Sequence, residues 1–305
     1  MEEENMLKRR KKESFFGILF ALPVMLGFII FVLAPLIVSL VLSVTDYNVL
    51  GAATGFVGFD NYKHFFDGTD IYFLKSLRVT AYYVLLSVPL QIAFAFFIAM
   101  LLNANIKGRS VFRTIFYLPT IVPAVASSIV WMMLFDPDTG ILNTVLKAVG
   151  MPGSRWIYGE STVIPSLALM SLWTVGGTVV IFLAGLQNVP KELYEAVEVD
   201  GGNWFRKLLA VTLPMVSPTI FFNLIMSFIG SFQVFSQAYI MTAGGPSNSS
   251  LFYVYYMYRE AFQYGNLGIA SALGWILFLI ILVLTLLVFR TSAVWVFYEG
   301  EVKNK

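Results

Sequence analysis

Six long apolar segments constrain this chain more than any other feature. They lie at residues 15–44, 79–102, 111–135, 161–186, 215–241 and 268–289. A helix needs about 20 predominantly apolar residues to cross a bilayer, so each segment is long enough to do so. The composition agrees, because 58% of the residues are hydrophobic, 12% are charged and the mean hydropathy is +0.78. The sequence therefore predicts an all-α membrane protein with six transmembrane helices. Local kinks are expected at the prolines within or near them, which are Pro23, Pro35, Pro89, Pro119, Pro123, Pro165 and Pro218.

The distribution of lysine and arginine predicts the orientation of these helices. Of 20 basic residues, fourteen lie in the tail 1–14, the connections at 103–113 and 187–210, and the C-terminal tail. Cytoplasmic loops carry the excess of positive charge, so both termini are expected in the cytoplasm. The expected division is a basic tail at 1–14, a membrane domain at 15–289 with a cytoplasmic loop at 187–214, and a second tail at 290–305.

The loop at 187–214, QNVPKELYEAVEVDGGNWFRKLLAVTLP, is more elaborate than a simple turn. Pro190 suits the first turn of a helix that continues to residue 200, and Gly201-Gly202 can end it in a left-handed backbone conformation. Asp200 is expected to accept backbone N–H groups of this turn. Asn203 is expected to cap a second short helix at 204–210.

The first of these short helices is predicted to be amphipathic. One side carries Val189, Leu193, Ala196 and Val197, with Tyr194 at its edge, and the other carries Lys191, Glu195 and Glu198. Helices that lie on lipid usually carry lysine and arginine on the polar side, whereas this side is mostly glutamate. An acidic polar side favours a protein partner, with a helix lying on lipid as the alternative.

The same loop resembles a known signature. Glu195-Ala196-Val197, then Gly201, then Val211-Thr212-Leu213-Pro214 is similar to the EAA motif of ABC-importer permeases, with departures at Val197 and Val211. FVGFDNY at 56–62, FRTIFYLPTIVP at 112–123, WMMLFDPDTGILN at 131–143 and MTAGGPSNSS at 241–250 resemble the carbohydrate-uptake branch of that family, the maltose and glycerol-phosphate type.

The resemblance implies the fold, location and partners of the chain. It implies a type I ABC importer permease in a prokaryotic cell membrane that pairs with a second, related permease and takes sugar from an extracytoplasmic solute-binding protein. Each permease would press its EAA loop into one of two cytoplasmic ATPase subunits, which hold the ATP and Mg, so that this chain needs no cofactor. The residues expected to couple to the ATPase are Glu195, Ala196, Val197, Asp200, Gly201, Leu213 and Pro214. The turn at Gly244, Gly245 and Pro246 is expected to face the binding protein.

The residues of this chain give little sign of a catalytic, metal or nucleotide site. Apart from Arg113 at the edge of the third, the six segments hold no Asp, Glu, Lys, Arg or His, and buried charges are the usual sign of proton relays. The chain has no phosphate-binding G-x-x-x-x-G-K-[ST] motif, no cysteine and a net charge of +2, which gives no sign of nucleotide hydrolysis, thiolate metal binding or nucleic-acid binding. We therefore expect a transport subunit without catalytic residues or metal. A sodium-coupled carrier or channel, or a membrane scaffold, is the alternative.

Polar residues in the fifth segment suggest a pathway for the transported molecule. At about 100° per residue, six positions share one arc of roughly 160°: Asn223, Ser227, Gly230, Ser231, Gln233 and Gln237. Aromatic residues, among them Phe221 and Phe232, gather on the other side, which is expected to face lipid. Sugars are bound by neutral donors and acceptors, so the polar arc is interpreted as a sugar pathway, with Ser171, Thr174 and Thr178 of the fourth segment as further candidates. The alternative is that these groups only bond neighbouring helices.

Overall fold

The computed structural model describes residues 2–49, 51, 55–104 and 107–297. The last part of the predicted C-terminal tail, from residue 298, lies outside them. The described residues form helices and loops, with two isolated antiparallel bridges, Thr45–Phe56 and Asn48–Asn266. The chain divides into two compact units, one of residues 1–67 and 260–276 and one of residues 68–259 and 277–305.

The first unit begins with a long, continuous helical run. Its elements are α1 (Glu2–Phe28), the π-helical η1 (Ile29–Leu33), α2 (Ala34–Ser43) and α3 (Asp60–His64), followed by part of η7 (Arg259–Gln263) and the start of α14 (Leu267–Trp295). Beyond α2, the Asn61 amide donates hydrogen bonds to the carbonyls of Ser43 (2.9 Å) and Thr45 (2.7 Å). Gly268 lies so close to Thr45 that a Cβ atom would collide with the Thr45 carbonyl. These contacts join the end of the first membrane helix to the start of α14.

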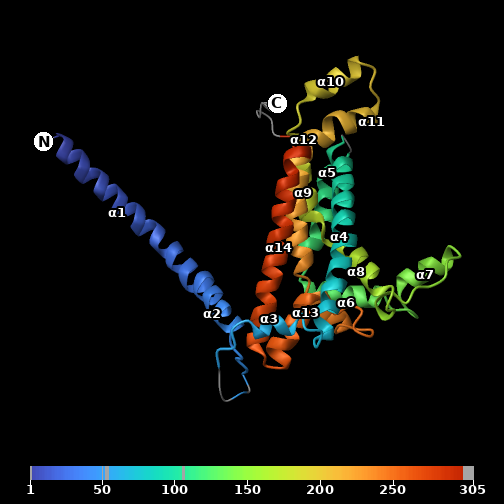
Figure 1. The fold of residues 1–305 in the computed structure, drawn as a ribbon. Coiled ribbons are helices and arrows are strands. Elements are labelled where there is room, and N and C mark those ends of the chain that lie inside the picture. Colours follow the sequence, from blue (N-terminus) through green and yellow to red (C-terminus); the bar gives the residue numbers. More distant parts are fainter. Residues whose placement is uncertain (1, 50, 52–54, 105–106, 298–305) are drawn as a thin grey trace. The chain divides into compact units, whose positions relative to one another are not determined.

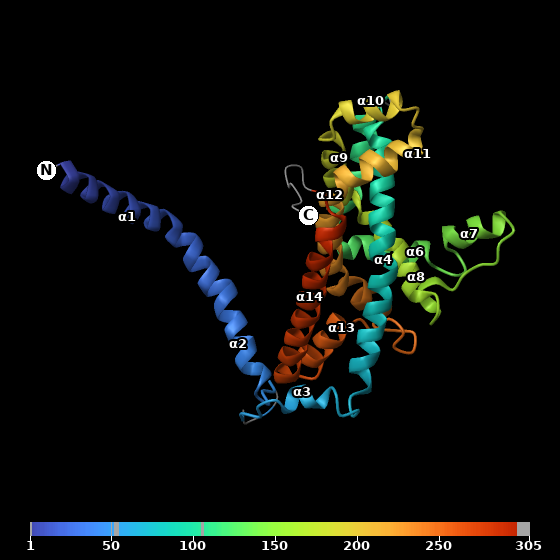
Figure 2. The ribbon, with the colours of Figure 1, turned by 45° about the horizontal axis from the view of Figure 1, so that its top comes forward.

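The second unit is a helical bundle around one long central helix, α4 (Ile71–Asn103). Its other elements are α5 (Arg109–Tyr117), η2 (Leu118–Ile121), α6 (Ala124–Leu134), α7 (Ile141–Ala148), η3 (Trp156–Tyr158), α8 (Val163–Ser171), η4 (Leu172–Thr174), α9 (Gly176–Gln187), α10 (Lys191–Val199), α11 (Trp204–Lys207), η5 (Leu208–Thr212), α12 (Leu213–Phe232), η6 (Ala238–Thr242) and α13 (Tyr253–Tyr258). Figures 1 and 2 show α4, α9 and α12 running side by side, with residues 277–295 of α14 next to α12.

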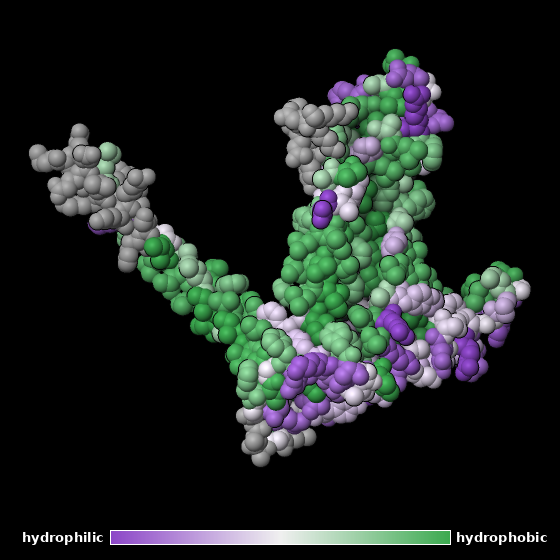
Figure 3. Space-filling view, viewed as in Figure 1, coloured by the Kyte–Doolittle hydropathy of each residue, from purple (hydrophilic) through white to green (hydrophobic). Residues whose placement is uncertain are grey.

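Small residues of α4 allow this close packing. Ala95 and Ala99 are fully buried and form one cluster with Val179 and Phe182 of α9 and Val216 of α12. The helix begins at Asp70, whose carboxylate accepts hydrogen bonds from the backbone N–H groups of residues 72 (2.8 Å) and 73 (3.0 Å), so that two of the free donors at the helix start are satisfied. In this unit apolar residues form a broad band along the bundle, and polar residues gather at its two ends (Figure 3), as expected for helices that cross a membrane.

Two of the predicted spans are bent rather than straight. The segment predicted at 111–135 consists of Arg109–Ile121 and Ala124–Leu134, which meet at 102°, and the one predicted at 161–186 consists of Val163–Thr174 and Gly176–Gln187, which meet at 54°. At the first bend Val122 is extended, because the following Pro123 disfavours a helical conformation and has no N–H to donate. The kinks predicted at Pro119 and Pro123 are therefore confirmed as one sharp bend, whereas Pro23, Pro89 and Pro218 lie inside unbroken α-helices.

The fifth predicted span was misplaced along the sequence. It was expected at 215–241, but the helix runs from Trp204 to Phe232 and breaks at residues 233–235. The expectation that its aromatic side faces lipid is also wrong. The Phe221 ring lies 4.9 Å from the ring of Phe289 and 6.0 Å from that of Trp295, and Phe232 is buried.

By length and composition, the described residues contain four helices able to cross a membrane, or up to six if each bent pair is one span. These four are Phe16–Ser43, Ile71–Asn103, Trp204–Phe232 and Leu267–Trp295. The prediction of an all-α membrane protein is confirmed.

Candidate functional site

The turn that ends α10 forms as the sequence predicted. Gly201 has a φ of +73°, its N–H donates to the Glu198 carbonyl (2.9 Å), and the N–H of Gly202 donates to the Val197 carbonyl (2.8 Å). These are the two bonds of a Schellman motif, with glycine at the left-handed position. Because they occupy both N–H groups, the expectation that the Asp200 carboxylate accepts them is wrong; Asp200 is exposed at the end of the helix.

The inward side of α10 differs from the predicted one. Tyr194 and Val197 pack on the buried cluster of α4, α9 and α12, whereas Leu193 and Ala196 are exposed with Glu195. The physical reason lies in Tyr194, which was expected at the edge. Its ring offers more apolar area than Leu193 or Ala196, and its hydroxyl has a partner in Thr212 (3.2 Å), so the helix is rotated to bury it.

The second half of the loop is the start of the fifth membrane helix. Asn203 caps it as predicted, because its side-chain oxygen accepts the N–H of Arg206 (2.9 Å). From Trp204 the helix continues through a π-helical turn, η5, into α12. Leu213 and Pro214 thus lie inside a continuous helix, and the wider π turn lies where Pro214 cannot donate a backbone hydrogen bond.

The outer surface of the loop combines exposed apolar groups with acidic ones. Glu192 and Glu195 are exposed on α10, and Val199 is 88% exposed at its end. Large apolar side chains continue along the start of the next helix, with Trp204, Phe205 and Leu209 all at least half exposed. A patch of this kind marks a site for a protein or membrane partner.

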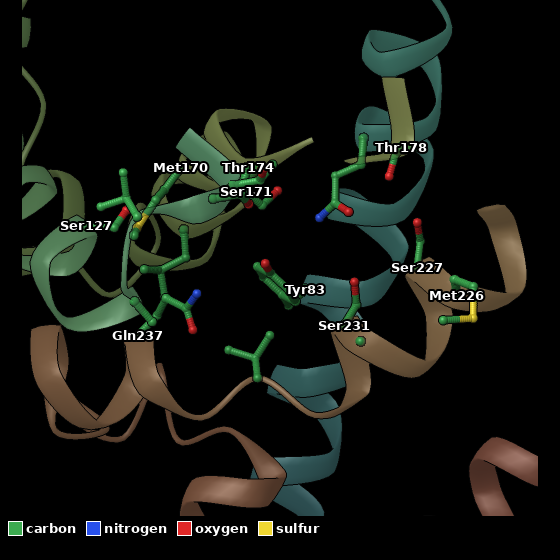
Figure 4. A pocket seen from close by; sticks show the side chains of 17 residues that line it. Tyr83, Ser127, Met170, Ser171, Thr174, Thr178, Met226, Ser227, Ser231 and Gln237 are labelled. Atoms are coloured by element: carbon green, nitrogen blue, oxygen red, sulfur yellow. Dashed lines mark hydrogen bonds between the residues drawn. The ribbon is translucent and has the colours of Figure 1, made fainter. Parts of the chain in front are cut away.

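A second candidate site is a polar cavity of about 460 Å³ inside the bundle (Figure 4). Its lining comes from α4, the bent pairs and the fifth helix. The predicted residues that reach it are Ser171, Thr174, Thr178, Ser227, Gly230, Ser231 and Gln237. The side chains that sequence reasoning missed include Tyr83, Gln91, Thr120 and Ser127. The polar groups among the lining residues are hydroxyls and amides.

Two residues of the predicted polar arc do not reach this cavity. Asn223 is 2% exposed, and its amide donates to the Thr219 carbonyl one turn earlier in the same helix (3.0 Å). Gln233 is exposed at the position where α12 has ended. A wheel of 100° per residue does not hold beyond Phe232, and Gln237 reaches the cavity from a new helical segment.

Ser127 has an unsatisfied hydroxyl in this cavity. The residue is 4% exposed, and its Oγ has no hydrogen-bond partner within the described part of the chain. Its neighbour Ser128 donates to the Ala124 carbonyl (2.7 Å), as serines in helices commonly do. The Ser127 hydroxyl is therefore available to bond a ligand in this cavity. The only sequence signal was a pair of serines in an apolar stretch.

The turn at 244–246 is tightly bonded within itself. Gly244 has a φ of +82°, and the Ser250 hydroxyl donates to the Gly245 carbonyl (2.6 Å). The Lys75 ammonium donates to the Ser247 carbonyl (2.5 Å) and ties this turn to α4. Gly245 and Pro246 remain partly exposed.

Comparison with known proteins identifies the family. The model of the family described as "Binding-protein-dependent transport system inner membrane component" matches residues 91–294. The chain belongs to this family. It is therefore a multi-pass inner-membrane permease subunit of an ABC transporter, in which the ATPase is a separate component. This family rules out the alternatives of a sodium-coupled carrier and of a scaffold.

Several curated members of the family are similar over nearly their whole length. The probable ABC transporter permease protein YesP of Bacillus subtilis is 40% identical over 295 residues, 95% of this chain and 94% of that protein. The arabinooligosaccharides transport system permease protein AraP of Bacillus subtilis is 31% identical, covering 93% and 89%. The diacetylchitobiose uptake system permease protein NgcF of Streptomyces coelicolor is 32% identical, covering 97% and 89%.

A solved structure shares the fold. It is a crystal structure of a bacterial alginate ABC transporter in complex with an alginate pentasaccharide-bound periplasmic protein. One of its chains matches with a TM-score of 0.81 and 22% identity over 93% of this permease and 96% of that chain.

Proposed function

We propose that this permease forms half of the translocation pathway for a sugar or related polyol. The observation that carries the proposal is the cavity of about 460 Å³, whose polar lining groups are hydroxyls and amides. Polyols are bound by neutral hydrogen-bond donors and acceptors, and a transport pathway must also release them. Relatives named for arabinooligosaccharide and diacetylchitobiose transport support a carbohydrate as the cargo.

The proposed topology has six spans in a type I importer fold within residues 15–289. Each bent pair counts as one span, and an even number of spans places both termini on one side of the membrane. The excess of lysine and arginine in the tails and in the loop at 187–214 supports the cytoplasm as that side. The turn at 244–246 then lies outside, where we propose that it contacts a solute-binding protein.

The proposed partners on the cytoplasmic side are two ATPase subunits, of which one receives this loop, together with a second permease in the membrane. The exposed surface of Glu195, Ala196, Val199 and Trp204 supports docking, because acidic and apolar groups are combined on it without a covering element in the described chain. In the docking loop, Gly201 holds the turn, Val197 anchors the helix to the bundle, and Leu213-Pro214 continue the helix toward the cavity.

The test is uptake in proteoliposomes containing the assembled transporter. Ser127, Ser231 and Gln237 are replaced singly with alanine, and Gln233→Ala is the matched control, because its side chain lies outside the cavity. Arabinooligosaccharides, diacetylchitobiose and maltose serve as probes. Each lost hydrogen bond is expected to weaken uptake about two- to tenfold or to alter preference among the sugars. Normal uptake by all three variants, or an equal defect in Gln233→Ala, would contradict the pathway assignment.

A further inference from the structure

Beside the docking helix α10 lies a cavity of about 300 Å³, which is lined in part by Tyr194 of that helix. The cavity is lined by the ends of α4 and α9 and by the start of the fifth helix, including Asn103, Leu186, Trp204 and Lys207. Among the described residues, the contacts that hold α10 to the bundle include the packing of Tyr194 and Val197, an ion pair and one hydroxyl pair.

The hydroxyl pair joins Tyr194 to Thr212 at 3.2 Å. The direction of the bond follows from the surroundings of Thr212. Its Oγ1 also lies 3.3 Å from the Lys207 carbonyl, which can only accept. Thr212 therefore donates to that carbonyl and accepts from Tyr194. Thr212 is 7% exposed, and Tyr194 is partly buried.

Thr212 occupies a distinctive place in the fifth helix. It ends the π-helical turn Leu208–Thr212, in which the N–H of Leu213 reaches back to the carbonyl of Leu208. Short π segments are local irregularities often found at functional sites. Beyond this turn α12 continues to Phe232 and carries Ser227, Gly230 and Ser231 into the polar cavity. A displacement of α10 that reaches Thr212 is thus applied to the helix that lines the pathway.

We propose that Tyr194 is the positioning residue that couples the docking helix to the pathway helix through Thr212. This inference rests on the proposed function, since it takes α10 as the element that an ATPase moves. The Val197 anchor is apolar and permits sliding, whereas a hydrogen bond fixes distance and direction. The ion pair between Lys207 and Glu198 is a weaker link, because the Glu198 side chain is 61% exposed and exposed pairs are screened by salt.

The variants separate the hydroxyl bond from packing. Tyr194→Phe removes only the donor, Thr212→Val removes the acceptor, and Thr212→Ser retains it. Thr212→Ser is thus the matched control. In reconstituted transporter, Tyr194→Phe and Thr212→Val are expected to copurify with the ATPase but to lose about two- to tenfold of the ATP hydrolysis stimulated by loaded binding protein. Thr212→Ser is expected to remain within twofold of the wild type.

A second measurement does not depend on the sugar. The chain has no cysteine, so spin labels can be placed at Lys191 on α10 and Phe222 on α12 of the full-length permease in nanodiscs. The distance distribution is expected to be narrow in the wild type and in Thr212→Ser, and broader in Tyr194→Phe and Thr212→Val. An unchanged distribution in Tyr194→Phe overturns the proposal. So does loss of copurification in that variant, which would make Tyr194 part of the docking surface itself.

Different results would contradict the two proposals, one obtained with the wild type and the other with Tyr194→Phe. If no sugar stimulates the wild-type transporter, the proposed cargo is wrong, and the spin-label distances still test the link between α10 and α12. If the wild type is stimulated and Tyr194→Phe behaves like it in both measurements, only the link is wrong.

Discussion

The two glycines at the end of α10 are required for different physical reasons, and their alanine variants should differ accordingly. Gly201 has a φ of +73°, but a Cβ atom added there would meet nothing within 4 Å. Gly202 does not have a positive φ. A Cβ atom added there, however, would fall within 3.0 Å of Val197 Cγ1 and 2.8 Å from the Val197 carbonyl oxygen. Gly201 is needed for conformation, and Gly202 is needed for space.

The two substitutions therefore carry different costs. Alanine at 201 must adopt a left-handed conformation, which costs about 1–2 kcal/mol. Asparagine tolerates that region better, so Gly201→Asn should approach the wild type. Alanine at 202 forces Val197 away from the buried cluster, and overpacking of this kind costs about 1–3 kcal/mol. Because Val197 anchors α10, the cost falls on the position of the docking helix, and the spans should remain folded.

The assay is copurification of the permease with its ATPase, together with ATP hydrolysis stimulated by loaded binding protein. A cost of about 1.4 kcal/mol reduces the correctly placed population of α10 tenfold relative to the displaced one. We expect activity to fall in the order wild type, Gly201→Asn, Gly201→Ala, Gly202→Ala, with the same elution volume in detergent for all four. Wild-type coupling in Gly202→Ala combined with a severe loss in Gly201→Asn would refute the reasoning.

Three further predictions concern topology and packing. A cysteine at Asn203 should react with a membrane-impermeant thiol reagent only in inverted vesicles, and one at Ser249 only in intact cells; the reverse would invert the proposed topology. Gly176→Ala should lower the melting temperature in detergent, because the added Cβ would lie 2.8 Å from the Tyr117 Cα and closer still to the Phe116 carbonyl oxygen. An unchanged melting temperature would show that α5 can move away. Asn143→Ala should speed proteolysis between residues 136 and 162, because its buried amide bonds the backbone of 137 and 154 and the indole of 156; wild-type cleavage would contradict this role.

Local features of the docking loop could be predicted from sequence. A left-handed glycine and a side-chain N-cap depend on a few neighbouring residues, so Gly201 and Asn203 were assigned correctly. The inward side of α10 could not be assigned, because it depends on a contact across the loop. The Tyr194 hydroxyl bonds to Thr212, which lies eighteen residues later in the sequence. A helical wheel of α10 alone does not include that partner.

The start and the end of the fifth helix could not be predicted from the local sequence either. The fifth helix starts at Trp204 because nothing interrupts it between Asn203 and Leu213. From the sequence, Leu213-Pro214 was instead interpreted as the point where the chain enters the membrane. The end of this helix at Phe232 moved Gln233 out of the cavity, while Gln237 reaches the cavity from a new segment. Some residues of the predicted polar arc therefore line the cavity, and others do not.

The polar cavity lies where the helices of the bundle are interrupted. Thr120 and Ser127 flank the bend at 122–123, Thr174 precedes the bend at residue 175, and Ser231 and Gln237 flank the break at 233–235. Straight apolar helices would close such a space by packing, whereas interrupted ones leave backbone groups that are tolerated within a membrane only when buried in protein or beside a water-filled cavity. The useful signal in the sequence is therefore a hydroxyl or amide side chain beside a proline or glycine within a span, as in LPTIVP, WTVGG and GSFQV, more than a polar stripe along one ideal helix.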